Sequence, residues 1–400
     1  MSSSSKPLLV LDSTAAPIRL AWWIIGAIFL IHGLVVSTWV SRIPAIQSRL
    51  HLTNGTLGLT LLGAAVGCVL ATPLCGWMVT RYGSKTITTW SSLGFCSSLM
   101  LIPLASDAAS LAAALVVCGG FAGTMDVAMN AQAVEVEKAF GRPSMSRFHA
   151  MFSLGGMAGA GLGGALAARG VSPSNHFLAA AVLLTIATAF TVPHMLSSPS
   201  QILATGKRVP LNQIPAELFA ISAIAFCMLL SEGAMADWTA VYFRQGLGAG
   251  PGTAAAGYAV FSAAMATCRL LGDAITVRLG SSNTVRTGSL LAAAGVLWAL
   301  VAHTPGWAFP GFAAAGAGFS TIVPIVFGAG GRIPGVSPGA GIATITGLGY
   351  TGFLVGPPLI GFTAQIFTLR YALGIVVLVC LFSAVLAGWV QTNVREQVAG

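Results

Sequence analysis

Long apolar segments alternate with short polar connections along the whole chain. A helix needs about 20 apolar residues to cross the roughly 30 Å hydrocarbon core of a bilayer. Twelve segments of this kind follow one another, at approximately 20–42, 56–79, 86–105, 110–135, 149–168, 176–196, 214–242, 254–277, 284–303, 306–328, 340–363 and 370–390. Their apolar runs are continuous and lack the alternation of barrel strands. The pattern therefore predicts an all-α membrane protein with twelve transmembrane helices.

The composition supports a lipid environment. Hydrophobic residues make up 56% of the 400 residues and charged residues only 7%, whereas about a quarter of the residues in soluble domains are charged. The net charge is +9, but the basic residues stand singly and form no dense stripe of the kind that binds nucleic acid. We therefore expect the lipid bilayer as a partner and exclude nucleic acid.

Enzyme and cofactor signatures are missing from the sequence. The seven cysteines are irregularly spaced within apolar runs, where a thiol behaves as a small hydrophobe, and they indicate no metal site. There is no phosphate-binding loop of the kind that ATP-driven pumps carry. We expect no cofactor and no enzyme activity.

The basic residues predict the orientation, because cytoplasmic loops carry an excess of Lys and Arg. One side of the predicted topology holds Lys6, Arg19, Arg81, Lys85, Lys138, Arg142, Arg147, Lys207, Arg208, Arg278, Arg286, Arg332 and Arg395. The other side holds Arg42, Arg49, Arg169, Arg244 and Arg370. This bias places both termini in the cytoplasm, and we expect a bacterial inner-membrane protein that is a monomer.

The chain divides near its middle. Residues 197–213 form the longest polar connection and are predicted to be a cytoplasmic linker between six-helix bundles at 1–196 and 214–400. An internal repeat supports this division. Arg81-x-Gly83 recurs 197 residues later as Arg278-x-Gly280.

Two further pairs share that offset. Gly155-x-x-x-Gly159 recurs as Gly352-x-x-x-Gly356, and the pair of Gly119 and Thr124 recurs as Gly316 and Thr321. Parallel repeats of six helices place a substrate site between the halves, near the bilayer midplane, and transport then occurs by rocking.

Acidic residues within spans are the first candidates for that site, because a charge in the hydrocarbon is costly. Asp126 lies deep in the fourth span, and Asn130 is one helical turn further on the same face. Asp126 is interpreted as a proton carrier or substrate ligand, the alternative being a buried polar clamp between helices. Glu232, in the outer half of the seventh span, is assigned to the same two roles.

Asp237 and Trp238 follow Glu232 on the seventh span. Five residues correspond to about 140° around a helix, so Glu232 and Asp237 cannot face one ligand unless the helix deforms. Asp237 is a candidate substrate ligand, or else an interfacial partner of a basic residue at the outer rim. Trp238 is a candidate substrate contact, or an aromatic anchor at the membrane surface.

The first span contributes His32, Trp39 and Arg42. His32 titrates near neutral pH and suits proton relay, but a single histidine can equally be a packing residue. Trp39 offers a flat stacking surface for a sugar ring or an organic cation. Arg42 is a candidate substrate ligand, or a residue that reaches the lipid headgroups.

Several segments resemble the major facilitator superfamily, and the resemblance covers all twelve spans. The segment Gly76–Lys85 is similar to that family's loop between helices two and three, with departures at Thr80 and Ser84. Arg269-Leu270-Leu271-Gly272-Asp273 with Arg278-x-Gly280 is closer to the family form. The motifs that resemble the YbjJ/MosC-like branch, which groups with fucose-permease-like sugar transporters, are Trp39–Ile46, Asp126 with Asn130, Glu232-Gly233, Asp237-Trp238 and Gly356-Pro357-Pro358.

The resemblance implies that the fourth helix lines a central cavity. It also implies gating residues at the inner surface, namely Arg81, Gly83, Asp273, Arg278 and Gly280. Asp273 and Arg278 are interpreted as a latch that holds the halves together in one state. Thr80 stands where the family has an acid, so we expect a weaker latch in the first half. Thr321 is added to the predicted substrate site.

These features predict a secondary transporter that couples a small polar organic solute, such as a sugar or cyclitol, to protons. The alternative is a multidrug/proton antiporter, because Gly155–Gly164 resembles the fifth-helix signature of such exporters. A receptor or scaffold that binds its ligand without transporting it is a third possibility.

Overall fold

The computed structural model describes residues 15–196 and 214–390. Within these ranges the chain is helical and contains no strand. Twelve helical segments are long and apolar enough to cross a bilayer, which confirms the predicted number of spans. The predicted linker, 197–213, lies outside the described residues. So do four of the basic residues that predict the orientation, Lys6, Lys207, Arg208 and Arg395.

The first half holds six spans. They are α1 (Ala15–Val40) with α2 (Ile43–Arg49), α3 (Asn54–Tyr82), α4 (Ser84–Ser98) with the 3-10 helix η1 (Leu99–Leu104), α5 (Ala108–Phe140), α6 (Met145–Ala168), and α7 (Pro173–Thr191) with η2 (Val192–His194). The second half holds six more. They are α8 (Ala216–Gln245), α9 (Pro251–Leu279), α10 (Ser281–Val301), α11 (Pro305–Phe319) with α12 (Ile322–Gly330), α13 (Pro338–Ile366), and α14 (Leu369–Leu386) with η4 (Ala387–Trp389).

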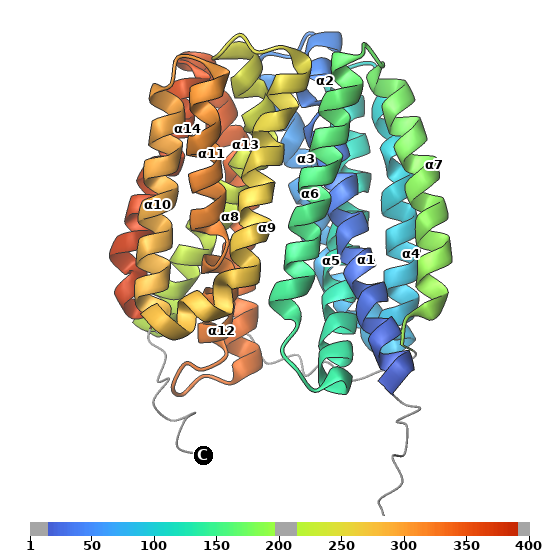
Figure 1. Cartoon of the computed structure of the whole chain (residues 1–400), viewed down its shortest axis with the longest axis vertical. Coiled ribbons are helices and arrows are strands. Elements are labelled where there is room, and N and C mark those ends of the chain that lie inside the picture. The colour runs from blue at the N-terminus through green and yellow to red at the C-terminus, as the bar shows by residue number, and fades with distance from the viewer. Residues whose placement is uncertain (1–14, 197–213, 391–400) are drawn as a thin grey trace, which may run out of the picture.

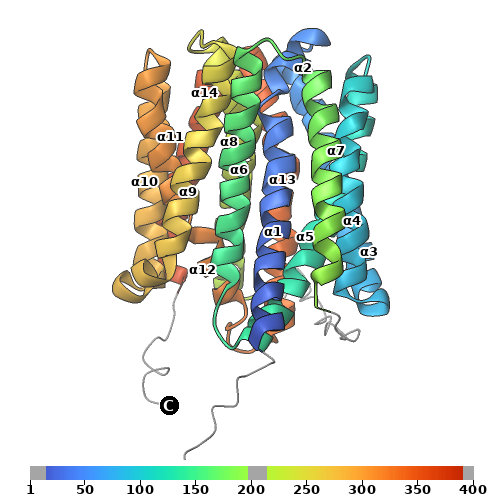
Figure 2. The ribbon, with the colours of Figure 1, turned by 45° about the vertical axis from the view of Figure 1, so that its right-hand side comes forward.

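The two halves stand side by side with their long helices parallel to one axis. The blue-to-green helices of the first half lie on the right of Figure 1, and the yellow-to-red helices of the second half lie on the left. We call the end of the bundle that carries α2 the α2 end, and the opposite end, which carries α12, the α12 end (Figures 1 and 2).

The glycines of the sequence repeat make equivalent contacts in both halves. A Cβ at Gly155 would overlap a backbone carbonyl of α1, and one at Gly352 would overlap a backbone carbonyl of α8. Likewise, a Cβ at Gly119 would overlap a backbone carbonyl of α3, and one at Gly316 would overlap a backbone carbonyl of α9. Small residues let helix backbones approach closely in the absence of water. The 197-residue repeat is therefore a repeat of helix contacts.

Gly83 and Gly280 also have equivalent conformations. Their φ angles are 84° and 76°, a region that L side chains rarely adopt, and each joins two helices at the α12 end. The predicted gating motifs thus mark the turns between α3 and α4 and between α9 and α10.

The halves pack tightly against each other at the α2 end. A Cβ at Gly58 of α3 would lie 3.0 Å from the Cα of Gly361 on α13, and a Cβ at Gly164 of α6 would lie 2.9 Å from the carbonyl oxygen of Gly252 on α9. Figures 1 and 2 both show α6 beside α9. Larger side chains at these positions would hold the halves apart.

The predicted single span at 306–328 is broken into two helices. Pro324 has no N–H, and its ring clashes with the carbonyl four residues earlier, which belongs to Ser320. Accordingly α11 ends at Phe319 and α12 begins at Ile322. The break leaves the Ser320 carbonyl free for another donor.

Candidate functional site

An ion pair lies in the middle of the spans. Arg269 Nη2 on α9 is 3.1 Å from Glu232 Oε1 on α8, and only 6% of the Arg269 side chain is exposed. Each residue is at least ten positions from the ends of its helix. Among residues 15–196 and 214–390, this is the single ion pair within 4.0 Å.

Arg269 also connects the two halves. Its Nη1 donates to Ser153 Oγ of α6 at 2.7 Å and to the carbonyl of His149 at 3.4 Å. Its Nε donates to the Ser320 carbonyl at 3.4 Å, the group that Pro324 leaves free. A buried guanidinium requires a counter-charge and satisfied N–H groups, and here each of its three nitrogens has an acceptor.

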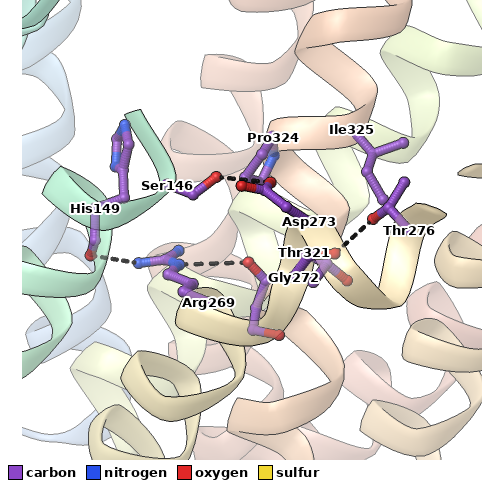
Figure 3. A pocket seen from close by; sticks show the side chains of 10 residues that line it. Ser146, His149, Arg269, Gly272, Asp273, Thr276, Thr321, Pro324 and Ile325 are labelled. Carbon is purple, nitrogen blue, oxygen red and sulfur yellow. Dashed lines mark hydrogen bonds between the residues drawn. The ribbon is translucent and has the colours of Figure 1, made fainter. Parts of the chain in front are cut away.

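A small pocket adjoins Arg269 on the α12 side. Its volume is about 30 Å³, room for one or two water molecules. Figure 3 shows Arg269 directed toward His149, while Ser146 of α6 points at Asp273 of α9. The Ser146 hydroxyl donates to Asp273 Oδ1 at 3.3 Å. This pocket therefore lies between the halves.

Asp126 forms a second polar cluster between the halves. The hydroxyl of Tyr350 on α13 donates to Asp126 Oδ2 at 3.2 Å, and Asn130 Nδ2 donates to Asp126 Oδ1 at 3.2 Å. All three residues are half-buried. Asp126 thus faces the other half of the molecule, and both of its hydrogen-bond partners are neutral.

The structure corrects two interpretations of the seventh span. Trp238 is completely buried, so it is not an aromatic anchor at the membrane surface. Asp237 is half-buried and forms no ion pair with any described basic residue. It is therefore not the partner of a basic residue at the outer rim.

The candidates of the first span lie apart from the acids. His32 is buried between the edges of Phe95 and Phe152, with ring centroids 5.2 and 5.3 Å away. It forms no hydrogen bond with Asp126 or Glu232. Its contacts with the two phenylalanine rings favour a packing role over proton relay. Trp39 packs against Phe177 of α7 at 6.4 Å, within the first half.

Arg42 lies at the α2 end and is 3% exposed, so its side chain stays within the helix bundle and does not extend to the membrane surface. The cavity beside it includes Ala167 of α6, whereas Arg269 contacts Ser153 of the same helix. Fourteen residues of helix correspond to about 21 Å. The structure therefore separates Arg42 from the Glu232 cluster.

Asp273 of the predicted latch contacts the opposite half of the molecule. Asp273 and Arg278 form no ion pair in the described part of the chain. Asp273 instead accepts the hydrogen bond from Ser146 across the halves. Arg81 and Arg278 are both exposed at the α12 end, and Thr321 is 8% exposed and lines the small pocket beside Arg269.

Sequence reasoning missed the importance of Arg269 and Tyr350. Arg269 entered only as part of a motif, although a basic residue in mid-span carries the same cost as an acid and deserved the same weight. The sequence did not indicate a role for Tyr350. Tyrosines are common in apolar helices, and the role of this one depends on the partner of its hydroxyl, which only the structure identifies.

Comparison with known proteins agrees with this arrangement. The family model described as Major Facilitator Superfamily matches residues 24–335. An uncharacterized MFS-type transporter of Yersinia pestis is 38% identical over 88% of this chain and 91% of its own length. Membrane protein MosC of Rhizobium meliloti is 30% identical over 86% of this chain and 84% of its own length.

Two more distant proteins are similar over most of the chain. The fosmidomycin resistance protein of Escherichia coli strain K12 is 23% identical over 74% of both chains. A crystal structure of a bacterial homolog of the human lysosomal transporter Spinster, inward-facing and occupied, has a TM-score of 0.70 at 14% identity and covers 92% of this chain and 96% of its own. The chain therefore belongs to the major facilitator superfamily, in its MosC-like branch, and is an integral membrane transporter rather than an enzyme.

Proposed function

We propose that this transporter couples a small polar organic solute, a sugar, cyclitol or amino-cyclitol, to the movement of protons across the bacterial inner membrane. The two halves rock about a central site and expose it to each side in turn. The observation that carries the proposal is Asp126, an acid placed between the halves whose hydrogen-bond partners are both neutral.

A proton can bind Asp126 without breaking an ion pair. Its two oxygens accept hydrogen bonds from the Asn130 amide and the Tyr350 hydroxyl. Protonation therefore removes a negative charge from the interior and leaves no opposite charge unpaired. This is the behaviour that a proton carrier needs.

The hydrogen bond from Tyr350 supplies the link between protonation and movement. It joins α5 of the first half to α13 of the second half. A hydrogen bond to an ionised carboxylate is stronger than one to a neutral group. Protonation of Asp126 weakens this contact between the halves and so changes the relative stability of the states that rocking connects.

The Glu232 and Arg269 pair has a different role in the proposal. Arg269 donates hydrogen bonds to Glu232 and to Ser153 of the opposite half. A solute hydroxyl that replaced one of these hydrogen bonds would change the contact between α9 and α6, and so the contact between the two halves. We assign the pair to substrate sensing, whereas the proton is carried by Asp126.

The charges of the central residues favour a neutral or cationic solute. Two acids, Asp126 and Glu232, stand against one arginine, Arg269, in the middle of the spans, and a third acid, Asp237, lies further toward the α2 end of α8. The ring of Phe353 lies 6.1 Å from that of Tyr350 and adds an aromatic surface. Sugars and cyclitols suit a site that combines hydrogen-bonding groups with an aromatic face.

The α12 end is assigned to the cytoplasm. Of the basic residues in the described part of the chain, the majority belong to the α12 end. Short cytoplasmic loops are enriched in Lys and Arg. Both termini then lie in the cytoplasm, and the protein is expected to act as a monomer because each chain holds both halves of the site.

The proposal is tested by solute flux into proteoliposomes under an imposed pH step. Sugars, cyclitols and cationic drugs are screened as solutes. Asp126→Asn is expected to abolish accumulation driven by the pH step while solute exchange at equal pH continues. The matched control is Asp107→Asn, an exposed acid in the loop before α5. Unchanged proton dependence in Asp126→Asn removes Asp126 from coupling.

The second candidate function is proton-driven export of cationic or amphipathic compounds. It is supported by the similarity to the fosmidomycin resistance protein, at 23% identity. Expression in a host that lacks drug pumps separates the two candidates. Resistance to several unrelated compounds supports export, whereas growth on a single carbon source supports uptake.

A further inference from the structure

A cavity of about 650 Å³ opens at the α2 end. Both halves contribute to its wall, Arg42, Gln47 and His51 from the first half and Arg244 with Gln245 from the second. Its volume is within the range of sites for small molecules. On α9 it reaches Ala254, fifteen residues or about 22 Å from Arg269.

Arg42 lacks a counter-charge. Only 3% of this residue is exposed, and its Nε donates to Nδ1 of His176 at 3.0 Å. Nη2 is buried and has no hydrogen-bond partner in residues 15–196 and 214–390. No described acid pairs with Arg42, although a guanidinium keeps its charge and is costly to bury alone. Arg269, by contrast, has Glu232.

A second guanidinium reaches the cavity from the other half. Arg244 donates from Nη1 to the carbonyl of Ala249 at 2.6 Å, and its side chain is otherwise exposed. The residues that line this cavity include no Asp or Glu. Two arginines without an acid form a site of positive potential, and the guanidinium fork matches a carboxylate or phosphate.

We propose that this cavity binds a small anion that bears a carboxylate or phosphate group. The positive site differs in charge from the acidic centre of the molecule, so its ligand is not the neutral or cationic solute assigned there. The group can come from a dissolved metabolite or from the headgroup of an anionic lipid, since both present the same oxygens to Arg42 and Arg244.

Occupation of the cavity favours one transport state. Gln245 Nε2 donates to Gln47 Oε1 at 3.1 Å, Gln47 Nε2 donates to Asn54 Oδ1 at 2.9 Å, and Asn54 Nδ2 donates to Gln245 Oε1 at 3.1 Å. This triangle joins the halves beside the cavity. An anion held by Arg42 and Arg244 adds a further bridge, and so stabilises the state closed at the α2 end.

The test measures thermal stabilisation of the purified full chain in a neutral detergent. The probes are inorganic phosphate and succinate for the dissolved source, and phosphatidylglycerol against phosphatidylcholine for the lipid source. Sodium chloride at equal ionic strength corrects for screening. Stabilisation by at least one probe beyond chloride is expected, and the arm that responds identifies the source.

Arg42→Gln and Arg244→Gln are each expected to weaken the apparent affinity for that probe at least tenfold. Arg169→Gln, which removes an exposed arginine outside the cavity wall at the same end, is the matched control and keeps wild-type affinity. Arg244 is exposed, so its variant remains informative if Arg42→Gln does not fold. The proposal is overturned if no probe exceeds chloride, or if all variants respond like the wild type.

Discussion

Asp126 and Glu232 are both acids in the middle of a span, yet their surroundings differ. Glu232 lies 3.1 Å from a buried guanidinium, whereas Asp126 receives hydrogen bonds from an amide and a hydroxyl and, within the described residues, has no charged partner. A proton on Glu232 would leave Arg269 buried without a counter-charge. A proton on Asp126 leaves nothing unpaired. The charge of the partner, rather than depth in the membrane, determines which acid can carry a proton.

The two buried arginines, Arg269 and Arg42, differ in the same way. Arg269 has a carboxylate and three further acceptors. Arg42, which is similarly buried, has only the hydrogen bond to His176 among the described side-chain contacts. A buried charge that is paired within the chain needs no external partner, whereas a buried charge without a counter-ion is costly and is relieved by an anion from outside. We therefore expect added anions to stabilise the protein through Arg42 and not through Arg269.

The largest expected effect is the loss of Arg269. Arg269→Gln leaves Glu232 as an uncompensated charge and should destabilise the protein by about 3–5 kcal/mol. The double variant Glu232→Gln with Arg269→Gln should recover most of that loss. Thermal unfolding of both variants in detergent measures the difference. Equal loss in the two variants would mean that the unpaired charge of Glu232 is not the cause of the destabilisation.

A smaller effect is expected for Tyr350→Phe, which removes the donor to Asp126. A hydrogen bond to a charged group contributes about 1.5–3 kcal/mol, so the pH profile of uptake should move upward by about one pH unit or more. Ser153→Ala is the control, because Arg269 keeps Glu232 and two carbonyls. A profile that moves equally in both variants contradicts the assignment of the proton to Asp126.

The smallest effect concerns Asp107, an acid outside the spans that serves as a reference for the buried ones. It caps α5, and hydrogen bonds from the backbone N–H and hydroxyl of Ser110 lower its pKa. Its ionised form therefore stabilises the fold above the pKa of the unfolded chain, and this contribution is lost as the pH falls through the lowered pKa, below about pH 4.

Asp107→Asn keeps a capping side chain without the titration. The difference in thermal midpoint between the wild type and this variant should be constant at neutral pH and change only in the acid range. A difference that varies near pH 7 would contradict the local assignment. Transport should be unaffected at neutral pH, which also qualifies the variant as the control for Asp126→Asn.

Helix contacts could be predicted from the sequence only where small residues repeat. Gly155 and Gly352 were matched by their offset, and the structure places them against α1 and α8 in equivalent positions. The break at Ser320 could have been inferred from Pro324, but nothing in the sequence indicated that Arg269 would use the freed carbonyl. The alternative of Trp238 as an aromatic anchor was wrong, because a position near the end of a span does not tell which face of the helix a residue occupies.

By itself, the sequence determined the environment, the number of spans and the internal repeat, because hydrocarbon imposes a length, a composition and a satisfied backbone on every crossing segment. It also restricted the chemistry to a few ionisable residues. Only the tertiary structure decided which of them are paired. The partners of Asp126, Glu232 and Arg42 lie on helices that are distant in the sequence, and the charge state and role of each group depend on those partners.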